Sequence, residues 1–230
     1  QWNAPANPHG VEFLNYGRIP LNLPKVAADQ DIHALIRSGQ FDYVIVEARR
    51  SGYLLPEWVE LPEHRGHHVP YEKNLEALAA IHRTIVESGA QTVLYIHPGL
   101  HGTADIKHPL AQVYQRLHSD LERIKINDKI HDVILVPAIF LWLDAVRRYG
   151  VDGWYADPGH GNALARYSSA CMLYTYLTGN DSRENDFKAL TELSQSWEII
   201  PEKSQLFASD EKAKWIKDQV WLYYSTRPQR

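Results

Sequence analysis

The segment Asp157-Pro158-Gly159-His160 places two side chains suited to proton transfer three residues apart. A histidine can take a proton from a hydroxyl or a water near neutral pH. An aspartate can bond its other ring nitrogen, fix the tautomer and stabilise the imidazolium. The alternative is that Asp157 and Pro158 only begin a turn before a helix. The strands and helices around the segment favour the functional interpretation.

Short β-rich runs alternate with helical runs of ~10–15 residues, which is typical of parallel β-α-β units. Compact apolar runs predict strands, and apolar residues at helical spacing predict helices. The predicted strands are 11–14, 41–46, 92–96 and 133–136. The predicted helices are 31–38, 75–86, 112–126 and 163–177. A last helix should begin at Ser209, with Trp215, Val220 and Leu222 facing the body.

In a parallel sheet of this kind the ligand binds beyond the carboxyl ends of the strands. The polar residues that follow the predicted strands are therefore expected to meet there. Besides His160 and Asp157, the catalytic candidates are Tyr16 and Glu47. Trp154 directly precedes the loop and is expected to stack on a sugar ring. The candidates for substrate binding are thus Asn15, Arg18, Arg49, Arg50, His97 and Trp154.

The segment 154–162, with Tyr167 and the residues Tyr174, Leu177, Thr178 and Gly179 after it, resembles the last block of the SGNH (GDSL-like) hydrolases. Segment 41–47 resembles the strand that carries the family's third block, and 93–97 the strand after it. The resemblance implies a three-layer α/β/α sandwich with a parallel sheet of four or five strands, flavodoxin-like in type. It implies one domain over 1–230, with 181–230 as a C-terminal helical extension. It also implies His160 as the base and Asp157 as its orienting acid.

The sequence departs from this family at the nucleophile. No Gly-Asp-Ser string occurs near the N-terminus, and Glu47-Ala48-Arg49-Arg50 stands where the family has Gly-x-Asn-Asp. Segment 11–17 can be aligned either as the family's first strand, with Asn15-Tyr16-Gly17 in place of the nucleophile block, or as its second strand. Ser51 is the serine nearest to a predicted strand end.

Several functions fit these residues. The resemblance implies a carbohydrate-active hydrolase that cleaves an acylated sugar or a polysaccharide. Tyr16, His160 and an arginine could instead eliminate across a uronic acid, as in a polysaccharide lyase. Glu47 and Asp157 could form the carboxylate pair of a glycoside hydrolase, given a suitable separation. A domain without a nucleophile that only binds a glycan or a partner is the third class.

Composition gives no reason to expect nucleic acid or a membrane as partner. The 230 residues carry a formal charge of −4, and no run reaches the ~18 consecutive apolar residues of a membrane helix. Cys171 is the single cysteine, so no intrachain disulfide can form. No signal peptide is visible, but the chain begins Gln1-Trp2 without Met, which suggests processing. We expect a secreted or periplasmic protein.

Three histidines, His64, His67 and His68, share the loop 61–70. Clustered histidines can bind zinc or copper, but this spacing matches no closed metal site. We therefore expect a polar loop, with no metal and no other cofactor in the protein.

Overall fold

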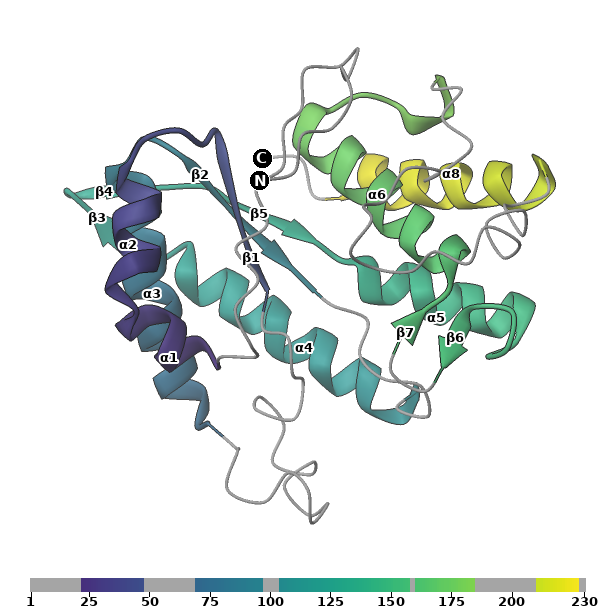
Figure 1. The fold of residues 1–230 in the computed structure, drawn as a ribbon, viewed down its shortest axis with the longest axis horizontal. Coiled ribbons are helices and arrows are strands. Elements are labelled where there is room, and N and C mark those ends of the chain that lie inside the picture. Colours follow the sequence, from purple (N-terminus) through teal and green to yellow (C-terminus); the bar gives the residue numbers. More distant parts are fainter. Residues whose placement is uncertain (1–21, 48–68, 97–103, 158–159, 185–209, 228–230) are drawn as a thin grey trace.

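The computed structural model describes residues 22–47, 69–96, 104–157, 160–184 and 210–227, which Figure 1 draws as ribbons. Side chains at 104–110 and at 157, 160 and 210 are outside this description. The predicted strand 11–14 lies outside the described residues.

The centre of the described structure is a parallel sheet of three strands in the order β1-β2-β5. β1 (Tyr43–Glu47) pairs with β2 (Gln91–Tyr95), and β2 pairs with β5 (Val133–Val136). All three strands were predicted to within two residues from their apolar runs. The prediction of a parallel α/β fold is thereby confirmed.

Helices connect and flank these strands. Asp29 caps the second helix by accepting hydrogen bonds from the backbone of Asp31 and Ile32. Gly179, with φ of 73°, ends the helix 163–178 in the left-handed conformation that favours glycine. The helices are α1 (Leu23–Ala28), α2 (Gln30–Arg37), α3 (Tyr71–Glu87), α4 (Ala104–Leu121), α5 (Ala138–Tyr149), α6 (Ala163–Thr178), the 3-10 turn η4 (Ser182–Glu184) and α8 (Asp210–Ser225).

The predicted helix 112–126 is wrong at both ends. α4 begins at Ala104 and stops at Leu121, and the next residues form a hairpin of β3 (Lys125–Ile126) and β4 (Lys129–Ile130). Asn127 and Asp128 make its turn with φ of 52° and 63°. A two-residue turn with two positive φ angles matches the twist of paired strands. That turn chemistry overrides the helical spacing of the apolar residues.

The two faces of β2 belong to two separate apolar clusters. Leu94 and Ile96 pack in the cluster that includes α3 and α4, while Val93 and Tyr95 pack in the cluster that includes α6 and α8. Successive side chains of a strand point to opposite faces, so this central strand is covered on both sides. In α8, Val220 is buried and Trp215 packs on the second cluster as predicted. Leu222 is 51% exposed, so its predicted inward position is wrong.

β1 is covered less completely than β2. Ile45 is the register partner of Val93, yet Tyr43 and Ile45 are 38% and 36% exposed. On the opposite face of the same strand, Val46 is buried in the first cluster. The sheet therefore has an open strip along β1, formed by Tyr43, Ile45 and Glu47, on the side where α6 lies.

The buried side chain of His82 should make the protein less stable in acid. It is fully buried in α3, where Nδ1 lies 2.8 Å from Thr92 Oγ1 of β2. Burial, with His131 nearby, lowers the pKa of His82 from 6.5 to about 4. Below pH 6.5 the unfolded chain therefore binds a proton that the folded chain does not bind until the pH reaches about 4.

We expect this residue alone to remove about 2 kcal/mol from the free energy of unfolding between pH 8 and pH 5. Urea unfolding at both pH values measures the loss. In the control variant His82→Gln the difference between the two pH values should shrink by a similar amount. An equally steep pH dependence in the variant would contradict this role.

Candidate functional site

Asp157 and His160 are brought together by a small antiparallel hairpin. β6 (Tyr155–Asp157) pairs with β7 (His160–Gly161), with Asp157 opposite His160 and Tyr155 opposite Gly161. Residues opposite one another in antiparallel strands have Cα atoms about 4.5–5.5 Å apart. The backbone thus holds the two candidate residues as direct neighbours, immediately before α6.

Asn162 fastens this hairpin to α6. Its Oδ1 accepts a hydrogen bond from the Ala165 backbone at 3.1 Å and so caps the helix. Its Nδ2 donates to the Gly153 carbonyl at 3.0 Å, and its backbone N–H donates to the Trp154 carbonyl at 3.0 Å. One residue therefore joins the start of β6, the end of β7 and the first turn of the helix.

Gly161 rests directly on the indole of Trp142 in α5. A methyl group at Gly161 would lie 2.3 Å from Trp142 Cη2 and 2.7 Å from Ala165 Cβ, closer than packed atoms approach. The Trp142 ring also makes an edge contact with Tyr155, with centroids 5.4 Å apart. Trp142 thus supports both strands of the hairpin, and only glycine fits at position 161.

Trp154 lies in the core rather than at the surface. It is 0% exposed, and its ring stacks on Tyr149 at 6.3 Å and meets Trp142 edge-on at 6.2 Å. No ring face is open to a sugar, so the predicted role of Trp154 in substrate binding does not hold. Its place in the sequence beside the loop did not reveal that the side chain points inward, where it packs beneath the hairpin.

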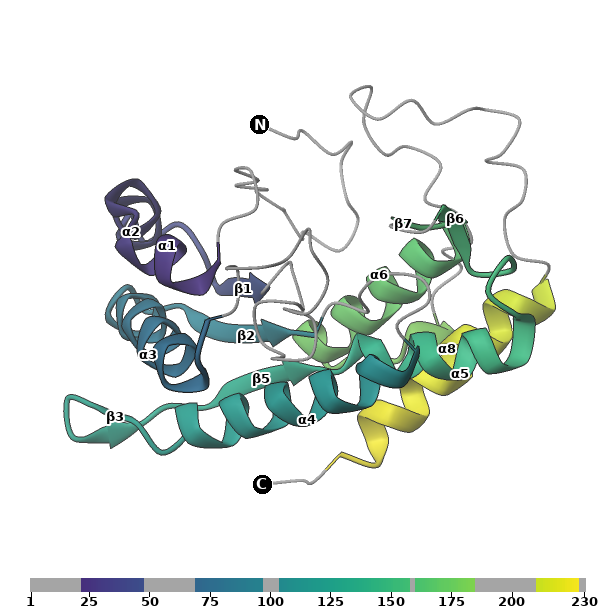
Figure 2. The same cartoon turned by 90° about the horizontal axis from the view of Figure 1, so that it is seen from below.

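The hairpin lies on the side of the molecule toward which the parallel strands point (Figures 1 and 2). Tyr95, at the end of β2, donates a hydrogen bond from its hydroxyl to Ser169 Oγ of α6 at 2.9 Å. Glu47, at the end of β1, is the register partner of Tyr95. Burial raises the pKa of Tyr95, and the nearby Glu47 carboxylate raises it further. Glu47 is half-buried and so keeps the strand-end position predicted for it.

One further predicted residue, Glu47, is described together with this hairpin. Glu47 and the backbone of Asp157 and His160 are described, and they lie toward the same end of the sheet. The remaining predicted residues lie outside the described part of the chain: Asn15, Tyr16, Arg18, Arg49, Arg50, Ser51, His64, His67, His68 and His97. Within the described ranges, no group of three or more His, Cys, Asp or Glu side chains is placed to hold a metal.

Arg166 was not predicted and lies beside the hairpin. Its Nε donates to the Gly161 carbonyl at 3.2 Å. It is the fourth residue of α6, near the helix end where the dipole disfavours a positive charge. An arginine in the first turn of a predicted helix is unfavourable, and this was the feature of the sequence that could have indicated a functional role for Arg166.

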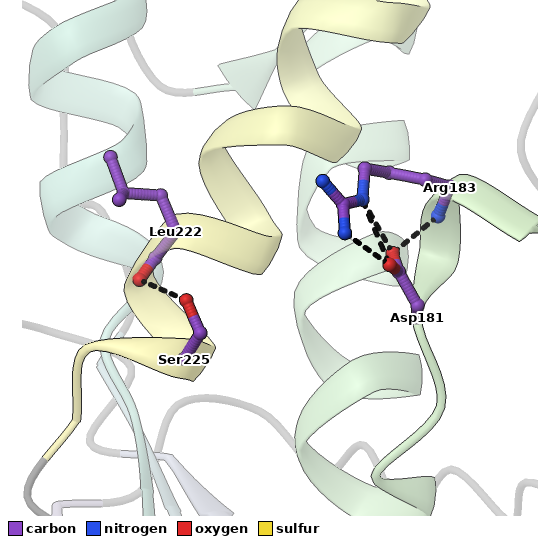
Figure 3. A network of polar contacts seen from close by, with 4 residues as sticks. All are labelled: Asp181, Arg183, Leu222 and Ser225. Carbon is purple, nitrogen blue, oxygen red and sulfur yellow. Dashed lines mark hydrogen bonds and ion pairs between the residues drawn. The ribbon is translucent and has the colours of Figure 1, made fainter.

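The opposite end of α6 carries a different charged cluster, shown in Figure 3. Arg183 donates from Nε and Nη2 to the Asp181 carboxylate at 2.8 and 2.5 Å. These hydrogen bonds hold the pKa of Asp181 below its usual value. Nearby, Ser225 Oγ donates to the Leu222 carbonyl at 3.3 Å. Arg183 is thus paired with the carboxylate of its own neighbour through Nε and Nη2.

A surface pocket of about 410 Å³ lies at the amino ends of the strands, away from the hairpin. Exposed Asp42 and Asp132, with His131 and the turn after α3, contribute to its lining. Its position contradicts the rule that ligands of parallel sheets bind beyond the carboxyl ends. We place the candidate site at the hairpin, because the anchored Asp157–His160 pair lies there.

No protein-family model matches the sequence, and neither a curated protein nor a solved structure matches it. None of the described helices is both long and apolar enough to cross a membrane.

The contact between Gly161 and Trp142 can be tested by coupled substitutions. Gly161→Ala should lower the free energy of unfolding by about 1–3 kcal/mol, because the added methyl overpacks the indole. Trp142→Phe removes the clashing ring atoms, so the double variant should lose less than the sum of the two single losses. Urea unfolding of the three variants measures this coupling.

Gly39→Ala is the matched control, since a methyl there meets no atom within 4 Å. It should lose about 1 kcal/mol from its positive φ and show no coupling with Trp142→Phe. Additive losses for Gly161→Ala and Trp142→Phe would contradict the contact.

Proposed function

We propose that this chain is a carbohydrate-active hydrolase of the SGNH type, in which His160 transfers the proton and Asp157 orients the imidazole ring of His160. The observation that carries the proposal is the antiparallel pairing of Asp157 with His160 directly before α6. Support also comes from the position of this hairpin on the side toward which the parallel strands point. Open parallel sheets in α/β proteins bind their ligands at that end.

The proposed chemistry is hydrolysis of an ester on a sugar. His160 takes a proton from a water as the water oxygen attacks the acyl carbon. The proton then passes from the imidazolium to the sugar oxygen as the ester bond breaks, which leaves a carboxylic acid and a free hydroxyl. Asp157 stays ionised throughout and stabilises the imidazolium. Water is the proposed nucleophile because the Gly-Asp-Ser string is absent from the sequence.

The open strip along β1 supports a sugar as the substrate. Tyr43 and Ile45 offer partly exposed apolar surface, and Glu47 adds a carboxylate at the end nearer the hairpin. A sugar ring has apolar faces and polar edges, so a strip of this mixed character suits a chain of such rings.

The finer fold that the resemblance implies, a three-layer α/β/α sandwich with four or five parallel strands, belongs to this proposal. The two apolar clusters on opposite faces of β2 support the layers. β1 is the edge of the described sheet, where a further strand would pair, and the predicted strand 11–14 is the candidate for that position.

Release of acetate from acetylated polysaccharides tests the proposal. We expect the wild type to release acetate and His160→Ala to lower kcat/KM by at least ~100-fold, since the proton shuttle is lost. His131→Ala is a matched control, because His131 lies by the pocket at the other end of the strands. Unchanged turnover in His160→Ala would refute the assignment.

Two other outcomes would replace the hydrolase by another function. An unsaturated product that absorbs in the near ultraviolet would show elimination from a uronate. Tight glycan binding with no product after long incubation would indicate a binding domain without a nucleophile.

A further inference from the structure

We propose that Arg166 binds an anionic group of the substrate, a carboxylate or a sulfate, beside the Asp157–His160 pair. The inference depends on the proposed function and adds a substrate class, a sugar chain that carries negative charge. Arginine suits this role because its planar guanidinium presents two parallel N–H donors to a carboxylate or a sulfate.

The guanidinium of Arg166 is held by the hairpin itself. Its Nε donates to the carbonyl of Gly161, the residue after His160, at 3.2 Å. Gly161 in turn cannot shift toward Trp142 or Ala165, which already lie at contact distance. The side chain is therefore bonded to the backbone of the residue that follows His160.

The outer nitrogens of Arg166 have no acidic partner among the described residues. No described carboxylate lies within ion-pair distance of this side chain, and its contact to Gly161 uses only Nε. Arg183 shows the opposite situation at the other end of α6, where Asp181 takes both Nε and Nη2 (Figure 3). Arg166 is exposed, so its outer edge can reach a ligand.

Arg166 lies at one end of a flank of α6 whose other end reaches β1. Residues three or four apart share one side of a helix, and this flank comprises Arg166, Ala170, Leu173 and Leu177, none of which is buried. Tyr43 of β1 donates from its hydroxyl to the Leu177 carbonyl at 2.9 Å, which places the Leu177 end of the flank beside β1. A sugar chain lying along this flank, from Tyr43 toward the hairpin, would meet Arg166.

The start of α6 strengthens the attraction for an anion. The first N–H groups of a helix carry a partial positive charge, and Asn162 caps only that of Ala165. The cation Arg166 lowers the stability of the helix at this position. An anion bound to Arg166 would offset both the guanidinium charge and the partial positive charge of the helix N-terminus. The same feature that disfavours Arg166 in the free protein therefore favours binding of a charged substrate.

The test compares turnover of uronate-bearing or sulfated acetylated oligosaccharides with that of neutral ones. Arg166→Gln should lower the ratio of kcat/KM for anionic over neutral substrates at least tenfold, mainly through KM. Arg166→Lys keeps the charge but loses the paired donors, so it should recover only part of the ratio. Arg83→Gln, an exposed arginine on α3, is the control and should leave the ratio unchanged. An unchanged ratio in Arg166→Gln would overturn the inference.

Binding without turnover separates this inference from the proposed function. Calorimetric titration with trigalacturonate, a sulfated trisaccharide and neutral xylotriose needs no catalysis. Preference for either anionic probe, lost in Arg166→Gln, supports the role of Arg166 even if no hydrolysis is found, and the preferred probe identifies carboxylate or sulfate. No preference for an anionic probe in the wild type, or a preference that survives in Arg166→Gln, overturns it.

Discussion

The close contact between the Gly161 backbone and the Trp142 indole is the constraint on which the candidate site depends. Because position 161 has no side chain, β7 can lie against the ring that also supports Tyr155 of β6. Asn162 then closes the unit by capping α6 and bonding to Gly153. The hairpin that carries Asp157 and His160 thus packs on the Trp142 ring and is joined by hydrogen bonds to the first turn of α6.

This unit is joined to the sheet by polar as well as apolar contacts. α6 packs against the Val93 and Tyr95 face of β2, and the hydroxyls of Tyr95 and Ser169 bond across that interface. The helix thus places its first turn, with the hairpin, toward the carboxyl ends of the strands. β1 is only partly covered on this face, so Tyr43 and Ile45 remain partly exposed.

The sequence predicted those features that depend on local pattern. Strand 133–136 and helix 163–177 were found because buried strands are compact apolar runs and because Gly179 ends the helix. The hairpin at 125–130 was missed, since its turn outweighs the helical spacing. Trp154 and Arg166 were misjudged or missed because their roles depend on which way a side chain points after tertiary packing. The spacing of apolar residues does not show which way a side chain points beside a three-residue strand, as at Trp154, or for a single arginine in a helix, as at Arg166.

The central claim is the proposal that Asp157 orients the ring of His160 through Nδ1–H, and proton NMR of the histidine rings tests it most directly. The account predicts a strongly downfield Nδ1–H resonance for His160 in the wild type, assigned by its loss in His160→Gln. That resonance should move upfield in Asp157→Asn, because the charged acceptor is gone. A His160 ring protonated only at Nε2, or an Nδ1–H signal that Asp157→Asn leaves unchanged, would contradict the account.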